Sequence, residues 1–268
     1  MVIQAKEVTL GFFYISKYVL SDYLYTEAHN WAYDNGYFRE GNHWWQLEMR
    51  GITNAIMFWE EEIVIANYLS LMEGLKPVYL KKDKSELLLL ATDIIDSVDA
   101  IPGAGIPLIQ YKPFYIDWNA DGYRLPTEVE WEFAARGGNK SMGYKYSGSD
   151  TLSEVKTNYY AYRSGIRYIS GQKKPNELGI HDMSSQASEW VLGQWMELGE
   201  LEPTHNPGHI SIYNFAKSFY LLQKGVNYLV GDDSYRPEER IKVQPDSEKF
   251  DFDRDFSVAS VRLVRRAK

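Results

Sequence analysis

The stretch from Gly122 to Gly138 reads GYRLPTEVEWEFAARGG. Thr127 follows a proline and precedes Glu130 by three positions, which is the spacing of a helix-capping box. Trp131 then begins an apolar face that the two alanines at 134 and 135 continue, and the terminal glycine pair supplies a stop. The sequence therefore predicts a short, firmly capped helix that buries a tryptophan.

Two further helices are predicted upstream of this stretch. Ser21 is a good N-cap for a helix that ends at Gly36, and Trp59 opens a helix that runs to Glu73 before Gly74. Negative charge crowds the first turn of the second helix. We expect these three residues, Glu60, Glu61 and Glu62, to complement the helix dipole from a solvated face.

Strand-like segments rich in β-branched and aromatic residues lie on both sides of these helices. They cover Val8–Tyr18, Phe114–Trp118, Phe219–Val230 and Val258–Val264. Between them, Ser85–Asp99 fits a helix or a strand, Pro102–Pro113 is typical of a link, and Gly231–Phe256 reads as a charged excursion. The pattern indicates an α+β protein with much irregular structure.

The string RLPTEVEWEFAARGG (Arg124–Gly138) resembles the signature of the formylglycine-generating enzyme, or sulfatase-modifying factor, family. Further similar segments follow in the family's order: Phe12–Tyr25, Asn54–Tyr79, Pro175–Trp190 and Ser260–Arg265. The resemblance implies a variant of the C-type-lectin-like fold. It also implies a single domain over residues 1–268, with residues 80–112 as an insertion where relatives have a brief connection.

Composition limits the function classes. The net charge of −8 disfavours nucleic-acid binding, because phosphate contacts need a basic face. No apolar run is long enough to span a bilayer. The N-terminus does not read as a signal peptide, and an exported parent whose leader was removed stays an open alternative.

The chain contains no cysteine. The family's namesake reaction uses a cysteine pair and copper, and thiolates are the ligands that Cu(I) prefers. Formylglycine generation by that route is therefore excluded. By resemblance, the old active-site region comprises eight residues: Trp190, Trp195, Asn227, Tyr228, Asp232, Asp233, Tyr235 and Arg236. Tyrosine, tryptophan and arginine commonly anchor binding contacts, and we expect these eight to contact a ligand.

Three places in the sequence carry residues that could bind a metal ion. The resemblance implies a calcium site, to which Asn158, Gln186 and Glu189 would contribute. The stretch Asp117–Glu128 also fits the letters of an EF-hand loop, but no helix precedes it, and we expect a polar turn instead. The pair His205 and His209 flanks Pro-Gly, which prevents one helix face from presenting both, so we expect a solvated loop pair.

The leading hypothesis is a non-catalytic pseudoenzyme of this family. Its lectin-like scaffold would present an aromatic and acidic surface to a protein or a small-molecule ligand, with no cofactor except calcium. Two alternatives stay open: a metal-dependent oxidase of altered chemistry, and a structural subunit of a surface or secretion assembly. In one subfamily of this fold retroelements diversify the ligand-contacting positions, and the composition of residues 227–235 is similar.

Overall fold

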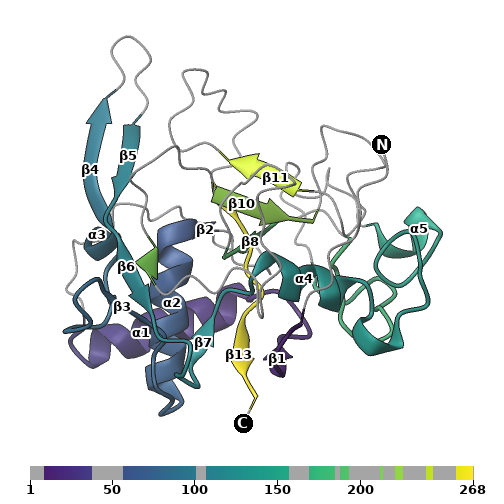
Figure 1. Cartoon of the computed structure of the whole chain (residues 1–268), viewed down its shortest axis with the longest axis horizontal. Helices are drawn as coiled ribbons and strands as arrows, with labels where there is room; N and C mark the ends of the chain where they lie inside the picture. The colour runs from purple at the N-terminus through teal and green to yellow at the C-terminus, as the bar shows by residue number, and fades with distance from the viewer. Residues whose placement is uncertain are drawn as a thin grey trace.

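The structure is a computed structural model, and Figure 1 shows it as a ribbon. It describes residues 9–37, 57–100, 107–156, 169–184, 188–192, 212–213, 221–225, 240–243 and 258–267. Helices and short strands alternate along these ranges, which confirms the α+β fold class. None of the helices within them is both long and apolar enough to cross a bilayer.

The two long helices, α1 (Asp22–Asp34) and α2 (Trp59–Met72), pack against each other on one side of the molecule. Three shorter helices follow along the described ranges: α3 (Ala91–Ile94), α4 (Glu128–Ala135) and α5 (Leu152–Val155), with a 3-10 turn at Gly138–Lys140. The Ser21 hydroxyl accepts from the Leu24 amide and caps α1. Gly74 follows α2 with a φ of 69°, a backbone conformation that favours glycine. The predicted ends of both helices are confirmed within two residues.

Thirteen short strands form five small antiparallel sheets in the described ranges. Their bounds are β1 (Phe13–Ile15), β2 (Met57–Phe58), β3 (Tyr79–Lys81), β4 (Ile95–Ala100), β5 (Pro107–Tyr111), β6 (Phe114–Ile116), β7 (Tyr123–Arg124), β8 (Glu189–Val191), β9 (Ile212–Tyr213), β10 (Leu221–Lys224), β11 (Arg240–Val243), β12 (Val258–Ala259) and β13 (Val264–Arg266). The orders are β1-β13-β7, β11-β10-β8, β12-β2, β3-β6-β9 and β4-β5. Strands from both ends of the chain are therefore neighbours, and β13 lies between β1 and β7 (Figure 1).

The capping box at the start of α4 is confirmed. The Thr127 hydroxyl accepts from the Glu130 amide at 3.2 Å, and the Glu130 carboxylate accepts from the Thr127 amide at 2.8 Å. The same carboxylate forms two 2.7 Å bonds with the guanidinium of Arg124, which lies on β7. Both side chains are buried, so this bidentate pair ties the helix start to the sheet.

The main core surrounds α2, which is buried along most of its length. Its buried Asn67 bonds to three backbone groups: the amide donates to the carbonyls of Tyr79 and Leu88 at 2.8 Å, and the carbonyl accepts from the Tyr79 amide at 3.1 Å. These bonds satisfy polar groups that burial would otherwise leave unpaired. A second core cluster contains Trp131 of α4 and Val191 of β8.

The expectation that the α2 glutamates lie on a solvated face is wrong for two of them. Glu60 is 1% exposed and Glu62 is fully buried. Among the residues that the structure describes, neither Glu62 carboxyl oxygen has a hydrogen-bond partner, while Glu60 accepts a 3.0 Å bond from the Tyr111 hydroxyl. A residue two positions along a helix lies on nearly the opposite side, so only a helix that is covered on several sides buries both.

Several predicted segments differ in length or type. The ambiguous Ser85–Asp99 contains α3 and most of β4, and the expected link at Pro102–Pro113 contains β5. β4 and β5 form a hairpin inside the predicted insertion, which projects from the body in Figure 1. The predicted closing strand is interrupted, because β12 ends at Ala259 and β13 begins at Val264.

Candidate functional site

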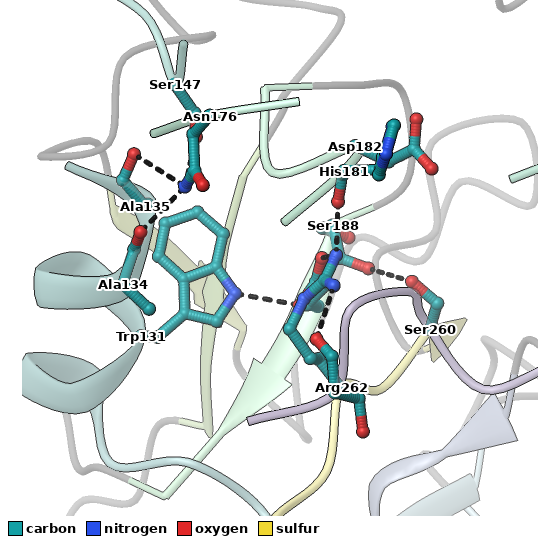
Figure 2. Close-up of polar contacts among 12 residues, drawn as sticks. Trp131, Ala134, Ala135, Ser147, Asn176, His181, Asp182, Ser188, Ser260 and Arg262 are labelled. Atoms are coloured by element: carbon teal, nitrogen blue, oxygen red, sulfur yellow. Dashed lines mark hydrogen bonds and ion pairs between the residues drawn. The ribbon is translucent and has the colours of Figure 1, made fainter. Parts of the chain in front are cut away.

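A buried ion pair lies where α4, β8 and the approach to β13 meet. The Glu189 carboxylate accepts from the Trp131 indole at 2.8 Å, and from the Arg262 guanidinium at 3.0 and 3.2 Å. Glu189 is 1% exposed and Arg262 is fully buried. Figure 2 shows Trp131 and Arg262 on opposite sides of these contacts. Both carboxylate oxygens are therefore engaged by donors of the protein itself.

The Arg262 guanidinium also holds two loops together. Its Nη1 donates to the Ser16 carbonyl at 2.9 Å, and its Nη2 donates to the His181 carbonyl at 2.8 Å. Burial of an arginine is costly unless its donors are satisfied, and here they are satisfied by three residues: Ser16, His181 and Glu189. Arg262 is a structural centre of the fold.

Asn176 secures the other end of α4 (Figure 2). Its side-chain amide donates to the Ala134 carbonyl at 2.7 Å and to the Ser147 hydroxyl at 3.2 Å. Its side-chain carbonyl accepts from the amides of Leu178 and Ile180. The last turn of a helix leaves carbonyls without partners, and Asn176 satisfies one of them while ordering its own loop.

Lys224 at the end of β10 is fully buried beside α4. Its ammonium nitrogen lies 3.4 Å from a carboxylate oxygen of Glu132 and 3.7 Å from one of Glu128, and 5.8 Å from the centre of the Trp131 ring. Both carboxylates are partly exposed, so the cation is placed at the boundary between core and solvent. The strand is thereby fixed immediately before Gly225, whose φ is 97°.

The structure describes two of the residues predicted for the ligand and calcium sites. Trp190 is fully buried in the main core, in contrast with the surface contact expected of it. Glu189 holds the ion pair described above, and the calcium prediction at this position stays a prediction. The remaining predicted residues lie outside the described ranges: Asn158, Gln186, Trp195, Asn227, Tyr228, Asp232, Asp233, Tyr235 and Arg236, as do His205 and His209.

The loop with EF-hand lettering forms the expected polar turn. The Asp117 carboxylate accepts from the Lys76 ammonium at 2.5 Å and from the Asn119 amide at 3.0 Å, and the Asp121 carboxylate accepts from the Lys76 amide at 3.0 Å. Glu128, the last ligand position of the pattern, faces Lys224 instead. In the described ranges, no three His, Asp or Glu side chains are arranged to hold a metal ion.

Sequence reasoning missed the burial of Glu62, Lys224 and Arg262, in addition to that of Glu60. Burial and the neighbouring carboxylates Glu189, Glu61 and Glu60 hold the pKa of Glu62 well above its ordinary value. A signal existed only for Arg262, which lies inside the segment that resembles the family's closing strand. Glu62 and Lys224 gave no such signal, because charged side chains are usually exposed.

The comparisons with known proteins agree with this fold. Residues 4–252 match the family model described as sulfatase-modifying factor enzyme 1-like domain. The crystal structure of CarF superposes on this structure with a TM-score of 0.59 at 23% sequence identity. The match covers 96% of this chain and 87% of the CarF chain. Variable protein 1 of Treponema denticola gives 0.61 at 22% identity, covering 97% and 86%.

Sequence relatives carry two kinds of name. Chaperone protein LppX of Paenibacillus barcinonensis is 32% identical over an alignment of 204 residues, and the match covers 69% of this chain and 63% of the relative. The inactive Cα-formylglycine-generating enzyme 2 of Bos taurus is 29% identical over an alignment of 113 residues, and that match covers 35% of this chain and 37% of the relative. The chain thus spans less than two thirds of either relative's length. Since the family model matches most of its residues, the chain belongs to the formylglycine-generating, sulfatase-modifying factor family.

Proposed function

We propose that this chain is a non-catalytic binding protein that uses the family scaffold to hold a protein ligand. The observation that carries the proposal is the absence of cysteine from all 268 residues. Without thiolates the chain lacks the ligands by which the family's route binds copper and oxidises a substrate cysteine. The scaffold has a buried network around Glu189 and Arg262, whose hydrogen bonds fix the positions of α4, β8 and the approach to β13.

The ligand surface is assigned to the predicted stretch that begins two residues after Gly225. It contributes Asn227, Tyr228, Asp232, Asp233, Tyr235 and Arg236, with Trp195 from the preceding segment. Lys224 supports this assignment, because its ion pairs with α4 fix the point from which the stretch departs. A fixed attachment lowers the entropy that a binding loop loses when a ligand is bound.

The chaperone name of the relative favours a protein as the ligand. Tyrosine and arginine provide large contact area at a small cost in side-chain entropy, and aspartates exclude acidic partners. We assign to this surface a polypeptide with exposed apolar and basic groups, such as a partly folded protein.

The experiment dilutes a chemically denatured model protein into buffer with and without the purified chain, and follows aggregation by light scattering. We expect suppression at stoichiometric amounts. The variant that combines Tyr228→Ala, Tyr235→Ala and Arg236→Ala should lose it. A matched control, Tyr23→Ala with Tyr33→Ala, removes exposed aromatic side chains from α1 and should keep it.

The rival enzyme hypothesis is tested in parallel. A peptide with the cysteine motif of a sulfatase is incubated with the chain, copper and oxygen, and its mass is followed. We expect an unchanged mass. Stoichiometric iron or copper in protein purified without chelator, together with turnover of that peptide, would overturn the non-catalytic assignment.

A further inference from the structure

The strands β1, β13 and β7 form one small sheet (Figure 1), and on it an arginine lies between two tyrosines. The register places Tyr14 of β1 opposite Arg265 of β13, and Arg265 opposite Tyr123 of β7. The guanidinium carbon lies 5.3 Å from the centre of the Tyr14 ring and 5.9 Å from that of Tyr123. Directly opposed residues point to the same face, so the three side chains form one row.

The row is preorganised, and its cation is available. The Tyr123 hydroxyl donates to the Glu73 carboxylate at 2.9 Å, which fixes one of the two rings. In the part of the chain that the structure describes, no hydrogen bond or ion pair engages the Arg265 guanidinium. Its planar fork of N–H donors matches the geometry of a carboxylate or a phosphate.

An apolar groove of about 430 Å³ lies beside the row. Its lining includes Tyr18, Leu20, Leu24, Leu69, Ile169 and Leu263. Leu263, which lines the groove, is two residues before Arg265 in the chain. Tyr123 belongs to both the groove and the row. A ligand that carries an apolar group close to an anion can therefore contact both.

The charges at this place differ in sign from those of the chain as a whole. The exposed Lys17 lines the same groove as Glu73, and Glu73 already accepts the Tyr123 hydroxyl. Among the described residues of the groove and the row, the two cations Lys17 and Arg265 face one carboxylate, Glu73, although the net charge of the chain is −8. The local excess of positive charge is complementary to an anionic group on the ligand.

We propose that this groove and the Tyr14–Arg265–Tyr123 row bind the C-terminal residue of a polypeptide. The apolar side chain of that residue occupies the groove, and its terminal carboxylate pairs with Arg265. One guanidinium fits one carboxylate, and the groove volume suits one or two side chains. The site shares no residue with the stretch assigned under the proposed function, so it goes beyond that function and is tested separately.

The test measures fluorescence anisotropy of a labelled hexapeptide that ends in leucine, added to the whole chain. We expect saturable binding of the peptide with a free carboxylate, and at least tenfold weaker binding of its C-terminal amide. Arg265→Gln should weaken binding of the free acid at least tenfold. Arg266→Gln is the matched control, since Arg266 is the next residue of β13, is exposed, and points to the other face.

A second variant tests the groove itself. Leu24→Glu places a carboxylate in the lining at a half-exposed position, and should abolish binding while leaving the urea midpoint of unfolding unchanged within error. Equal affinity for acid and amide, equal loss in the Arg265→Gln and Arg266→Gln variants, or no binding at all would overturn the proposal. Tighter binding of decanoate than of the peptide would identify a lipid as the ligand and would overturn the assignment of a polypeptide.

Discussion

The Trp131 indole donates to the Glu189 carboxylate at 2.8 Å, across 58 residues of sequence. The same oxygen accepts from Arg262, which lies 73 residues further along the chain. A helix, a strand and the approach to the last strand thus meet at one carboxyl group. A substitution of Glu189 therefore removes contacts that position all three elements.

Glu189→Gln is expected to destabilise the protein strongly. The buried Arg262 would lose its charge partner but keep its own charge, and breaking a buried pair in this way costs about 3–5 kcal/mol. Urea unfolding followed by tryptophan fluorescence measures the difference. Glu154→Gln is the control, because its ion pair with Lys174 is half exposed and should change the midpoint little. Equal effects of the two substitutions would refute a structural role of the buried pair.

Because Glu62 is buried, we expect the free energy of unfolding to fall as pH rises. Its pKa in the folded protein is well above the ordinary value of about 4.3 in an unfolded chain. Between these two values the folded state holds a proton that the unfolded state has released. Folding therefore loses up to about 1.4 kcal/mol per pH unit from this group.

Glu62→Gln removes that titration. The variant should be more stable than the parent at pH 8, and the advantage should shrink to zero as pH falls toward 4. Urea midpoints at five pH values measure it. Glu61, whose pKa burial raises to about 8, is present in both proteins and contributes to both curves. An advantage that does not depend on pH would contradict a neutral Glu62.

Asn67→Leu should be among the most destabilising substitutions in α2. The leucine is similar in size, but it leaves the Tyr79 amide and the carbonyls of Tyr79 and Leu88 buried without their partner. Each unsatisfied group costs about 1–3 kcal/mol. We expect a loss of at least about 3 kcal/mol in chemical unfolding. Ser70→Ala in the same helix is the comparison, because it removes bonds to one carbonyl and one amide.

Gly122→Ala is expected to be destabilising for steric reasons alone. A Cβ at this position would lie 2.6 Å from the Ser70 hydroxyl oxygen and even closer to the Lys76 carbonyl oxygen. Gly143→Ala is the matched control: a Cβ there meets open space, and its cost is that of a φ of 73°, about 1 kcal/mol. In thermal unfolding, the midpoint temperature of the Gly122→Ala variant should be lower than that of the Gly143→Ala variant. The reverse order would show that the turn before β7 relaxes easily.

Much of the local structure was predictable, because its causes lie within a few residues. The capping box of Thr127 and Glu130, the N-cap at Ser21 and the stop at Gly74 each depend on bonds that span fewer than five positions. The ordering of segments along the family pattern was also visible, and the family model and the superpositions confirm it. Lengths of the short strands were not predictable, since each depends on partners far away in sequence.

By itself the sequence determined the boundaries of α1, α2 and α4, the α+β class and the exclusion of thiolate–copper chemistry, since a missing residue type cannot be supplied by folding. Only the tertiary structure decided which charges are buried. Glu62, Lys224 and Arg262 are polar by composition, yet their surroundings are formed by segments far away in the chain. The free energy of a charge depends on the groups that the fold brings around it, and that neighbourhood exists only after folding.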